Sequence, residues 1–258
     1  MGINEKLCEF DKYRIICYNK KHNLRVYLGL QYPSDKGQLK QSNCLHEVRY
    51  KVLQGSLKKI LLWGLFFIGD VIVMKIESKR LILRNYEDGD ISDLVEGLNN
   101  IEVAKWMAGV PFPYTEQDAK NFIERAKNQD SSSKIMLAIV LKENNKVIGG
   151  TEIRNINKKD GTAGGGIWLN EKYQKNGYGT EAFSTRNKYC FDVLGLRRIE
   201  NGYFPNNEKS RKMQMKLGYK DEGIRRKKFL CLATNEYVDE CITGVLKEEF
   251  IAWSDRIE

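Results

Sequence analysis

The order of apolar and polar residues predicts short strands and helices that alternate from residue 80 onward. A strand is expected at 80–84, then a helix that follows the acidic capping residues 87–90 and runs to 99. A second helix is expected at 115–128, where Thr115 and Asp118 have the spacing of a capping box and apolar residues recur at helical spacing. Two hairpin strands follow at 135–141 and 147–156, joined by polar residues. The pattern predicts an α/β domain.

Residues 1–73 have a different pattern. Their one long apolar run, at 60–69, is about half of the roughly 20 residues that a bilayer span needs, and it begins too late for a secretory signal. It could be a buried strand or helix, while the composition at 14–18 and 24–30 favours a small appended hairpin. A further alternative is that residues 1–73 are not part of the natural product. We expect a boundary at Met74, with an N-terminal extension at 1–73 and a self-contained domain at 74–258.

Composition and charge exclude several classes of protein. The chain has 258 residues, of which 41% are hydrophobic and 30% charged, which excludes a disordered or polytopic membrane protein. The net charge of +9 invites a nucleic-acid interpretation, but residues 1–73 hold 12 Lys and Arg against 6 Asp and Glu, whereas residues 74–258 hold 31 against 28. The basic excess therefore belongs mostly to the extension, and no helix-turn-helix, zinc-finger or RNA-recognition signature accompanies it. A nucleic-acid-binding protein remains the alternative from another class.

Cysteine and histidine limit the chemistry further. The six cysteines form no C-x-x-C pair, so we interpret them as reduced thiols of a cytoplasmic protein, and we expect Cys190 to pack in the core. Both histidines, His22 and His46, precede residue 74, so imidazole cannot serve as acid or base in the larger domain. No metal, membrane or nucleic-acid partner is expected.

A glycine-containing loop at 174–179 carries the most information. The sequence Gln-Lys-Asn-Gly-Tyr-Gly follows an expected strand at 166–169 and precedes an expected helix at 180–194. Glycines at 177 and 179 allow a tight turn and close approach of a ligand, and the start of the following helix makes an anion site suited to a phosphate or diphosphate. The spacing fits neither a dinucleotide fingerprint nor a nucleotide P-loop.

The loop and its flanks resemble a known family. Q-x-x-G-x-G between a strand and a helix is similar to the acetyl-CoA signature of the GCN5-related N-acetyltransferases (GNAT). Further landmarks resemble the branch with the ribosomal-protein N-terminal acetyltransferases, of RimJ/RimL type: Leu196-Arg197-Arg198-Ile199, Asn207-x-x-Ser210, Lys216-Leu217-Gly218-Tyr219, Glu222-Gly223 and Glu236-Tyr237-Val238-Asp239. The resemblance covers residues 76 to about 250.

The resemblance implies a fold and a cofactor site. The fold is a mixed, mostly antiparallel central sheet with helices on both faces and a splayed parallel strand pair, in which the pantetheine arm of acetyl-CoA lies. The implied cofactor-binding residues are Ile167, Trp168, Leu169, Gln174, Lys175, Asn176, Gly177, Tyr178, Gly179, Thr180, Asn207 and Ser210. Asn207 has an equally good interpretation as a plain helix cap.

The reaction that the resemblance implies is direct attack of an amine on the thioester, with no covalent enzyme intermediate. A main-chain N–H near Leu169 could stabilise the oxyanion. Where many members have a glutamate base this chain has Gly164, and where many have a tyrosine acid it has Gln214. The remaining candidates are Ser210 as proton donor and Glu152 as a base that acts through water. Alternatively, Ser210 is an ordinary residue of the first helical turn, and Glu152 is an ordinary solvated residue of a strand. A degenerate domain that binds CoA without catalysis is the corresponding alternative.

The acceptor is inferred from the missing base. At neutral pH an α-amine is partly uncharged whereas a lysine amine is almost fully protonated, so we expect an α-amine of a peptide or protein, with an aminoglycoside, polyamine or amino acid as alternative. Trp106, Phe112 and Tyr114 are candidates for an acceptor groove, although core packing suits them equally. The basic residues 225–228 are interpreted as a solvated turn, with attraction of an acidic acceptor or of the ribose phosphate of the cofactor as the alternative. A monomer or homodimer is expected.

Overall fold

The computed structural model describes residues 4–10, 13–20, 23–30, 46–51, 66–68, 71–73 and 75–256. The chain divides into two compact units, Met1–Leu62 and Trp63–Glu258.

In the first unit, four strands form an antiparallel sheet of order β1-β2-β3-β4. Its strands are β1 (Asn4–Phe10), β2 (Tyr13–Lys20), β3 (Asn23–Leu30) and β4 (His46–Lys51). The segments 14–18 and 24–30 lie in β2 and β3, which pair as a hairpin, one of the alternatives left open by the sequence. Of the apolar run at 60–69, residues 60–65 and 69 lie outside the described residues. The boundary at Met74, and the idea that residues 1–73 are not native, stay predictions.

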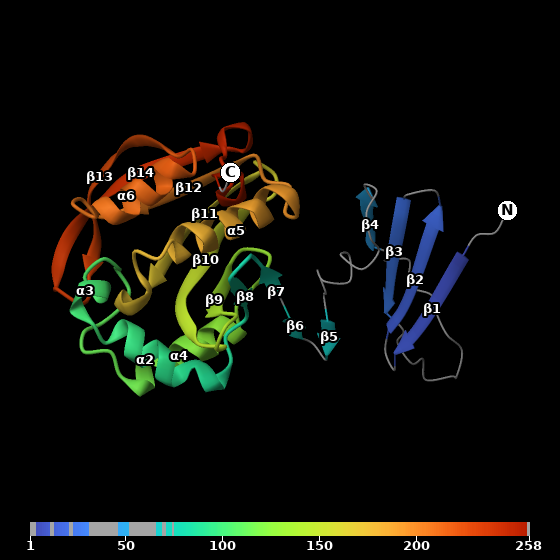
Figure 1. The fold of residues 1–258 in the computed structure, drawn as a ribbon, viewed down its shortest axis with the longest axis horizontal. Helices are drawn as coiled ribbons and strands as arrows, with labels where there is room; N and C mark the ends of the chain where they lie inside the picture. The colour runs from blue at the N-terminus through green and yellow to red at the C-terminus, as the bar shows by residue number, and fades with distance from the viewer. Residues whose placement is uncertain are drawn as a thin grey trace. The chain divides into compact units, whose positions relative to one another are not determined.

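The second unit is built around a mixed sheet of order β13-β14-β12-β11-β10-β9-β8-β7, seen edge to edge in Figure 1. Its strands are β7 (Lys75–Glu77), β8 (Leu81–Arg84), β9 (Ile135–Leu141), β10 (Val147–Asn157), β11 (Thr162–Leu169), β12 (Arg198–Tyr203), β13 (Lys220–Cys231) and β14 (Glu236–Leu246). A separate antiparallel pair consists of β5 (Phe66–Ile68) and β6 (Val71–Val73).

Helices cover both faces of the mixed sheet. They are η1 (Asp88–Asp90), α2 (Ile91–Leu98), α3 (Ile101–Ala104), α4 (Glu116–Lys127), η2 (Glu171–Tyr173), α5 (Tyr178–Asp192), α6 (Glu208–Lys216), η3 (Lys247–Glu249) and η4 (Trp253–Arg256). One core joins the sheet to α2, α3 and α4, and a second joins it to α5 and α6. No helix among the described residues has the length and apolarity needed to cross a membrane.

Strand β9 shows why the sequence folds into three layers. All seven of its residues are buried, and they alternate between the two cores. Ile135, Leu137, Ile139 and Leu141 belong to the core under α5, whereas Met136, Ala138 and Val140 belong to the core under α2 and α4. A strand covered on both faces needs apolar residues at every position, which this run supplies.

The helix boundaries follow their caps. Thr115 and Asp118 form the expected capping box of α4, since the Thr115 side chain accepts from the Asp118 amide and Asp118 accepts from the Thr115 amide. Asn207 caps α6 by accepting from the Ser210 amide. Helices α4 and α6 therefore begin where the sequence placed them, whereas α5 begins at Tyr178, two residues before its expected start.

Strands β11 and β12 are the parallel neighbours in the sheet. Their pairing runs only from Thr162–Arg198 to Gly165–Asn201. β11 continues to Leu169 and β12 to Tyr203 without further pairing between them, so the two strands diverge beyond Gly165 and Asn201. The predicted architecture, a mostly antiparallel sheet with helices on both faces and one splayed parallel pair, is confirmed.

One predicted turn is wrong. Residues 225–228 belong to strand β13, which pairs with β14 on either side of a bulge between Arg225 and Phe229. Lys227 adopts a φ of 45° in this bulge. The four basic side chains are exposed as expected, and a run of charges on an exposed strand carries no sequence signal that separates it from a turn.

Candidate active site

The loop at 174–179 presents unpaired amides at the start of α5. Gly177 is the N-cap residue, with a φ of 79°, a left-handed conformation that glycine adopts without strain. No side chain caps this helix, so the amides of Tyr178, Gly179 and Thr180 have no acceptor among the described residues. The amides and the helix dipole together favour an anion at this point.

An ion pair with Arg80 braces the same loop from outside. Arg80 Nε lies 2.7 Å from Glu181 Oε2, and Arg80 NH1 donates to the Asn176 carbonyl over 3.1 Å. The guanidinium also lies 4.3 Å from the centre of the Tyr178 ring. Glu181 is fully buried and accepts further bonds from the Ser78 hydroxyl and the Arg80 amide, each of 2.8 Å. Arg80 therefore fixes the loop to the connection between β7 and β8.

The Gln174 side chain ties the loop to its neighbours. Its Nε2 donates to the Leu169 carbonyl over 3.1 Å, and its Oε1 accepts from Lys209 Nζ over 3.0 Å. These bonds connect the loop with the end of β11 and with α6. The glutamine of the motif thus holds the loop in place.

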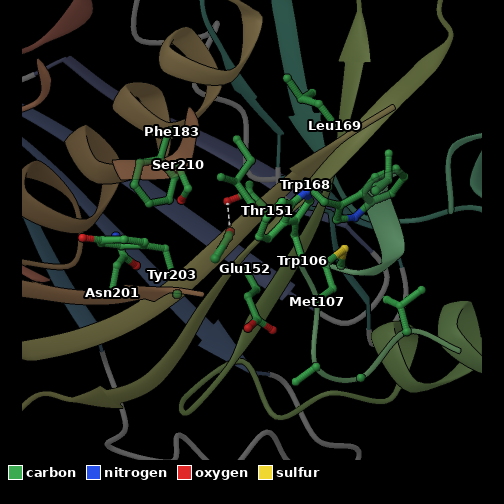
Figure 2. A pocket seen from close by; sticks show the side chains of 18 of the residues that line it. Trp106, Met107, Thr151, Glu152, Trp168, Leu169, Phe183, Asn201, Tyr203 and Ser210 are labelled. Atoms are coloured by element: carbon green, nitrogen blue, oxygen red, sulfur yellow. Dashed lines mark hydrogen bonds between the residues drawn. The ribbon is translucent and has the colours of Figure 1, made fainter. Parts of the chain in front are cut away.

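A cavity of about 1180 Å³ opens where β11 and β12 diverge. Figure 2 shows part of its lining, with labelled side chains from β10, β11, β12, α5 and α6. Ten of the residues implied as cofactor-binding line it: Ile167, Trp168, Leu169, Gln174, Lys175, Gly177, Gly179, Thr180, Asn207 and Ser210. Asn176 and Tyr178 do not, since both are turned toward Arg80. The Trp168 side chain lies at the cavity wall and packs in the core with residues of α2, α3 and α4 (Figure 2).

Ser210 lies at the cavity with its hydroxyl hydrogen available. Its Oγ accepts from Gln214 Nε2 over 3.1 Å. Gln214 is buried, and its Oε1 accepts from the Thr243 hydroxyl of β14 over 2.5 Å. Gln214 therefore connects α6 with the sheet and orients Ser210, whose own O–H remains to donate elsewhere.

Every carboxylate that lines the cavity is held by a donor of the chain. Glu152, the base candidate, has Arg154 NH1 2.7 Å from Oε1 and Lys134 Nζ 3.2 Å from Oε2. The other lining carboxylates are bound as follows: Glu102 by Lys105, Asp118 by Thr115, Asp130 by Ser132 and Glu240 by Arg225. Hydrogen bonds from Thr115 and Ser132 lower the pKa of Asp118 and Asp130 respectively. Each lining carboxylate thus already has a donor of the chain as its partner, and Glu152 stays a candidate base.

The aromatic candidates for the acceptor groove do not all reach the cavity. Trp106 and Tyr114 line it, whereas Phe112 is 43% exposed and does not. Burial raises the pKa of Tyr114 to about 12, and its hydroxyl has no hydrogen-bond partner among the described residues. The structure thus brings two of the three together.

Glu240 is a lining residue that the sequence interpretation missed. It is 5% exposed, and it packs so closely over Gly202 of β12 that a Cβ there would lie 2.3 Å from its Oε1. Its Oε2 accepts from Arg225 NH1 over 3.0 Å. Side chains alternate between the two faces of a strand, so Glu240 shares a face with the apolar Val238 and Ile242. This pattern could have predicted that the carboxylate is buried.

Cys190 is a core residue, as expected. Its side chain is fully buried, and burial raises the pKa of the thiol to about 11. It is therefore protonated at neutral pH and does not act as a nucleophile.

Comparison with known proteins gives concordant matches. Residues 80–220 match the family model described as Acetyltransferase (GNAT) domain. The uncharacterised N-acetyltransferase YnaD of Bacillus subtilis is 30% identical over 179 residues, which cover 69% of this chain and 99% of that protein.

Solved structures agree. A GNAT-family acetyltransferase from Bacillus anthracis matches with a TM-score of 0.60 at 27% identity, over 68% of this chain and 100% of that chain. RimJ of Mycobacterium smegmatis, solved in complex with CoA-disulfide, has a TM-score of 0.59 at 18% identity, over 69% of this chain and 88% of its own. The second likeness concerns the fold alone.

Proposed function

This chain belongs to the GNAT acetyltransferase family, and from that membership we propose that it transfers the acetyl group of acetyl-CoA to the α-amine of a peptide or protein. That it is an N-acetyltransferase follows from the family. The acceptor, and a place near the ribosomal-protein branch of the family, are the proposal.

The residues of the site fit coenzyme A. The unpaired amides of Tyr178, Gly179 and Thr180 suit its diphosphate, and Lys175 adds positive charge. Beyond Gly165 the edge of β11 that faces β12 has no strand partner, so its peptide groups can pair with the amides of a pantetheine arm. When bound, acetyl-CoA supplies a thioester whose carbonyl carbon an amine can attack.

The residues of the chain bind and orient the two substrates and transfer a proton. The gap between the diverging strands β11 and β12 is called the slot below. Its lining residues hold the amine and the thioester together, and a main-chain N–H near Leu169 stabilises the oxyanion. The C–N bond forms as the C–S bond breaks, and the Ser210 hydroxyl, oriented by Gln214, donates its proton to the departing sulfur. As the amide forms, the nitrogen loses a proton, which returns to the Ser210 oxygen. No side chain forms a covalent intermediate.

The pairing of every lining carboxylate carries the proposal for the acceptor. Without an unpaired carboxylate in the lining, the amine must arrive uncharged. About a tenth of an α-amine with a pKa near 8 is neutral at pH 7, compared with fewer than about one in a thousand lysine amines. An α-amine therefore suits this site.

A thiol-release assay with acetyl-CoA tests the acceptor. We expect α-amine peptides to react at least about 100-fold faster at pH 7 than Nα-blocked lysine peptides, in line with their neutral fractions. Raising the pH to 9 should increase the lysine rate more than the α-amine rate. A faster lysine peptide at pH 7 would overturn the proposal, and turnover confined to aminoglycosides, polyamines or free amino acids would move the function to that alternative.

A further inference from the structure

A buried polar cluster lies behind the inner end of the slot. It consists of Arg186 and Asn187 on α5, Asn201 on β12 and Tyr219 just before β13. Their exposed fractions are 0% for Arg186 and Asn187, 6% for Asn201 and 3% for Tyr219. Four polar side chains thus occupy a position between helix and sheet where an apolar core is usual.

The three guanidinium nitrogens of Arg186 have no hydrogen-bond partner among the described residues, whereas the Tyr219 hydroxyl interacts with the side chains of Asn187 and Asn201. The closest support for the cation is Phe183, whose ring centre lies 4.1 Å from Arg186 Cζ. Burial raises the pKa of Tyr219 to about 12, so its hydroxyl stays a donor at neutral pH. The cluster therefore combines an uncompensated positive charge with further donors, which is the chemistry of an anion site.

The cluster adjoins the point where β11 and β12 separate. A Cβ on Gly165 would lie 2.4 Å from Arg186 NH1, so the guanidinium packs directly against this glycine. Asn201 is the register partner of Gly165, and these two residues form the last pair before the strands diverge. Gly165 and Phe183, which pack against the guanidinium, both line the cavity, as does Asn201.

We propose that Arg186, with Asn187, Asn201 and Tyr219, forms a carboxylate pocket at the acyl end of the slot, so that the enzyme takes as donor, besides acetyl-CoA, an acyl-CoA whose acyl group ends in a carboxylate. The Asn201 amide turns aside to admit the carboxylate, and its contact with the Tyr219 hydroxyl is replaced by one with the ligand. This inference rests on the proposed function, because it takes the slot to hold a CoA thioester.

The chemistry is that of acetyl transfer with another acyl group. The amine forms a C–N bond with the thioester carbonyl, the C–S bond breaks, and the sulfur leaves as thiolate and receives the proton that the nitrogen loses. The terminal carboxylate is unchanged and pairs with the guanidinium. One or two methylenes between carbonyl and carboxylate, as in malonyl and succinyl groups, keep the acyl chain short enough for the slot.

Calorimetric titration of the full chain with CoA thioesters tests the pocket without knowledge of the acceptor. Succinyl-CoA and butyryl-CoA have acyl chains of similar length and differ in the terminal carboxylate. We expect succinyl-CoA to bind at least about tenfold more tightly than butyryl-CoA, as a charge-assisted hydrogen bond predicts. Equal affinity for the two thioesters, or weaker binding of succinyl-CoA, would show that the polar cluster does not bind a carboxylate and would overturn the inference.

A variant pair assigns the effect to the cluster. Arg186→Met keeps most of the side-chain volume and should abolish the preference for succinyl-CoA, with acetyl-CoA affinity changed by less than about twofold. Lys188→Met removes the same charge from an exposed position on the same helix and should keep the preference. A preference that survives in Arg186→Met would contradict the assignment. If that variant does not fold, the comparison of ligands on the native chain still decides.

The outcomes separate this inference from the proposed function. If acetyl-CoA binds and is turned over but the carboxylate gives no advantage, the inference fails and the function stands. If no CoA thioester binds, both fail.

Discussion

Ser210 is the residue with the clearest proton to give. Gln214 occupies one lone pair of its hydroxyl oxygen, and the hydrogen is left for another acceptor. Replacing Ser210 with alanine should lower kcat about 100-fold, at the lower end of general-acid effects, and weaken CoA binding measured by calorimetry far less than that. Ser92→Ala, in the exposed first turn of α2, is the matched control and should keep full activity. An unchanged kcat in Ser210→Ala would remove this serine from the mechanism.

Gly177 is the residue on which the anion site depends most. Its φ of 79° disfavours any side chain, and a Cβ would meet Arg80 NH2 at 3.3 Å. We expect Gly177→Val to weaken CoA binding at least about tenfold, since the strain is of order 1–3 kcal/mol and displaces the amides of the loop. Gly89→Val, at an exposed glycine with no atom within 4 Å of its Cβ position, should bind CoA normally. Similar affinities for the two variants would contradict the role of the loop.

Residue-scale chemistry was predictable where it is local. The sequence predicts the helix caps at Thr115 and Asn207 and the tight turn at Gly177, because caps and left-handed turns depend on a few neighbouring residues. Arg80 and Glu181 gave no such signal, since they are 101 positions apart in the chain and meet only in the folded sheet. The pairing of Glu240 with Arg225, and the burial of Arg186, were hidden for the same reason.

At the scale of elements, Arg80 links the β7–β8 connection to α5. Arg80→Met leaves the buried Glu181 without its cation and should destabilise the protein by about 3–5 kcal/mol, measured by denaturant unfolding. CoA affinity should fall as well, because the Asn176 carbonyl loses its donor.

A double variant separates these two effects. Arg80→Met with Glu181→Met removes the uncompensated charge and should recover most of the stability, but not the CoA affinity. Recovery of both would show that the brace acts through stability alone. If the double variant recovers neither stability nor CoA affinity, the loss of stability in Arg80→Met comes from lost packing and not from the unpaired charge.

Elements were predictable in proportion to their periodicity. The fully apolar β9 and the amphipathic α4 carry strong patterns and appear within about a residue of their expected bounds. The short α3 has too few residues for a period, and the charged, exposed β13 is held by its pairing with β14, which leaves no pattern in its own sequence.

At the scale of the whole molecule, one geometrical fact produces the site. The sheet is continuous until β11 and β12 diverge, and the loop before α5 faces the gap so formed. The resemblance predicted this splay, whereas alternation of apolar residues alone could not, because two parallel strands that pair and two that diverge have the same pattern. The polar cluster at the acyl end of the slot likewise could not be predicted, because its residues come from α5, β12 and the residue before β13 and meet only in the folded protein.

Hydrogen exchange measured along the full chain, with and without saturating CoA, tests the central claim most directly. The account predicts slowed exchange in two separate segments at once, the amides of residues 175–180 and those of residues 166–169. Protection at other segments with these two unchanged, or no protection at all, would contradict it.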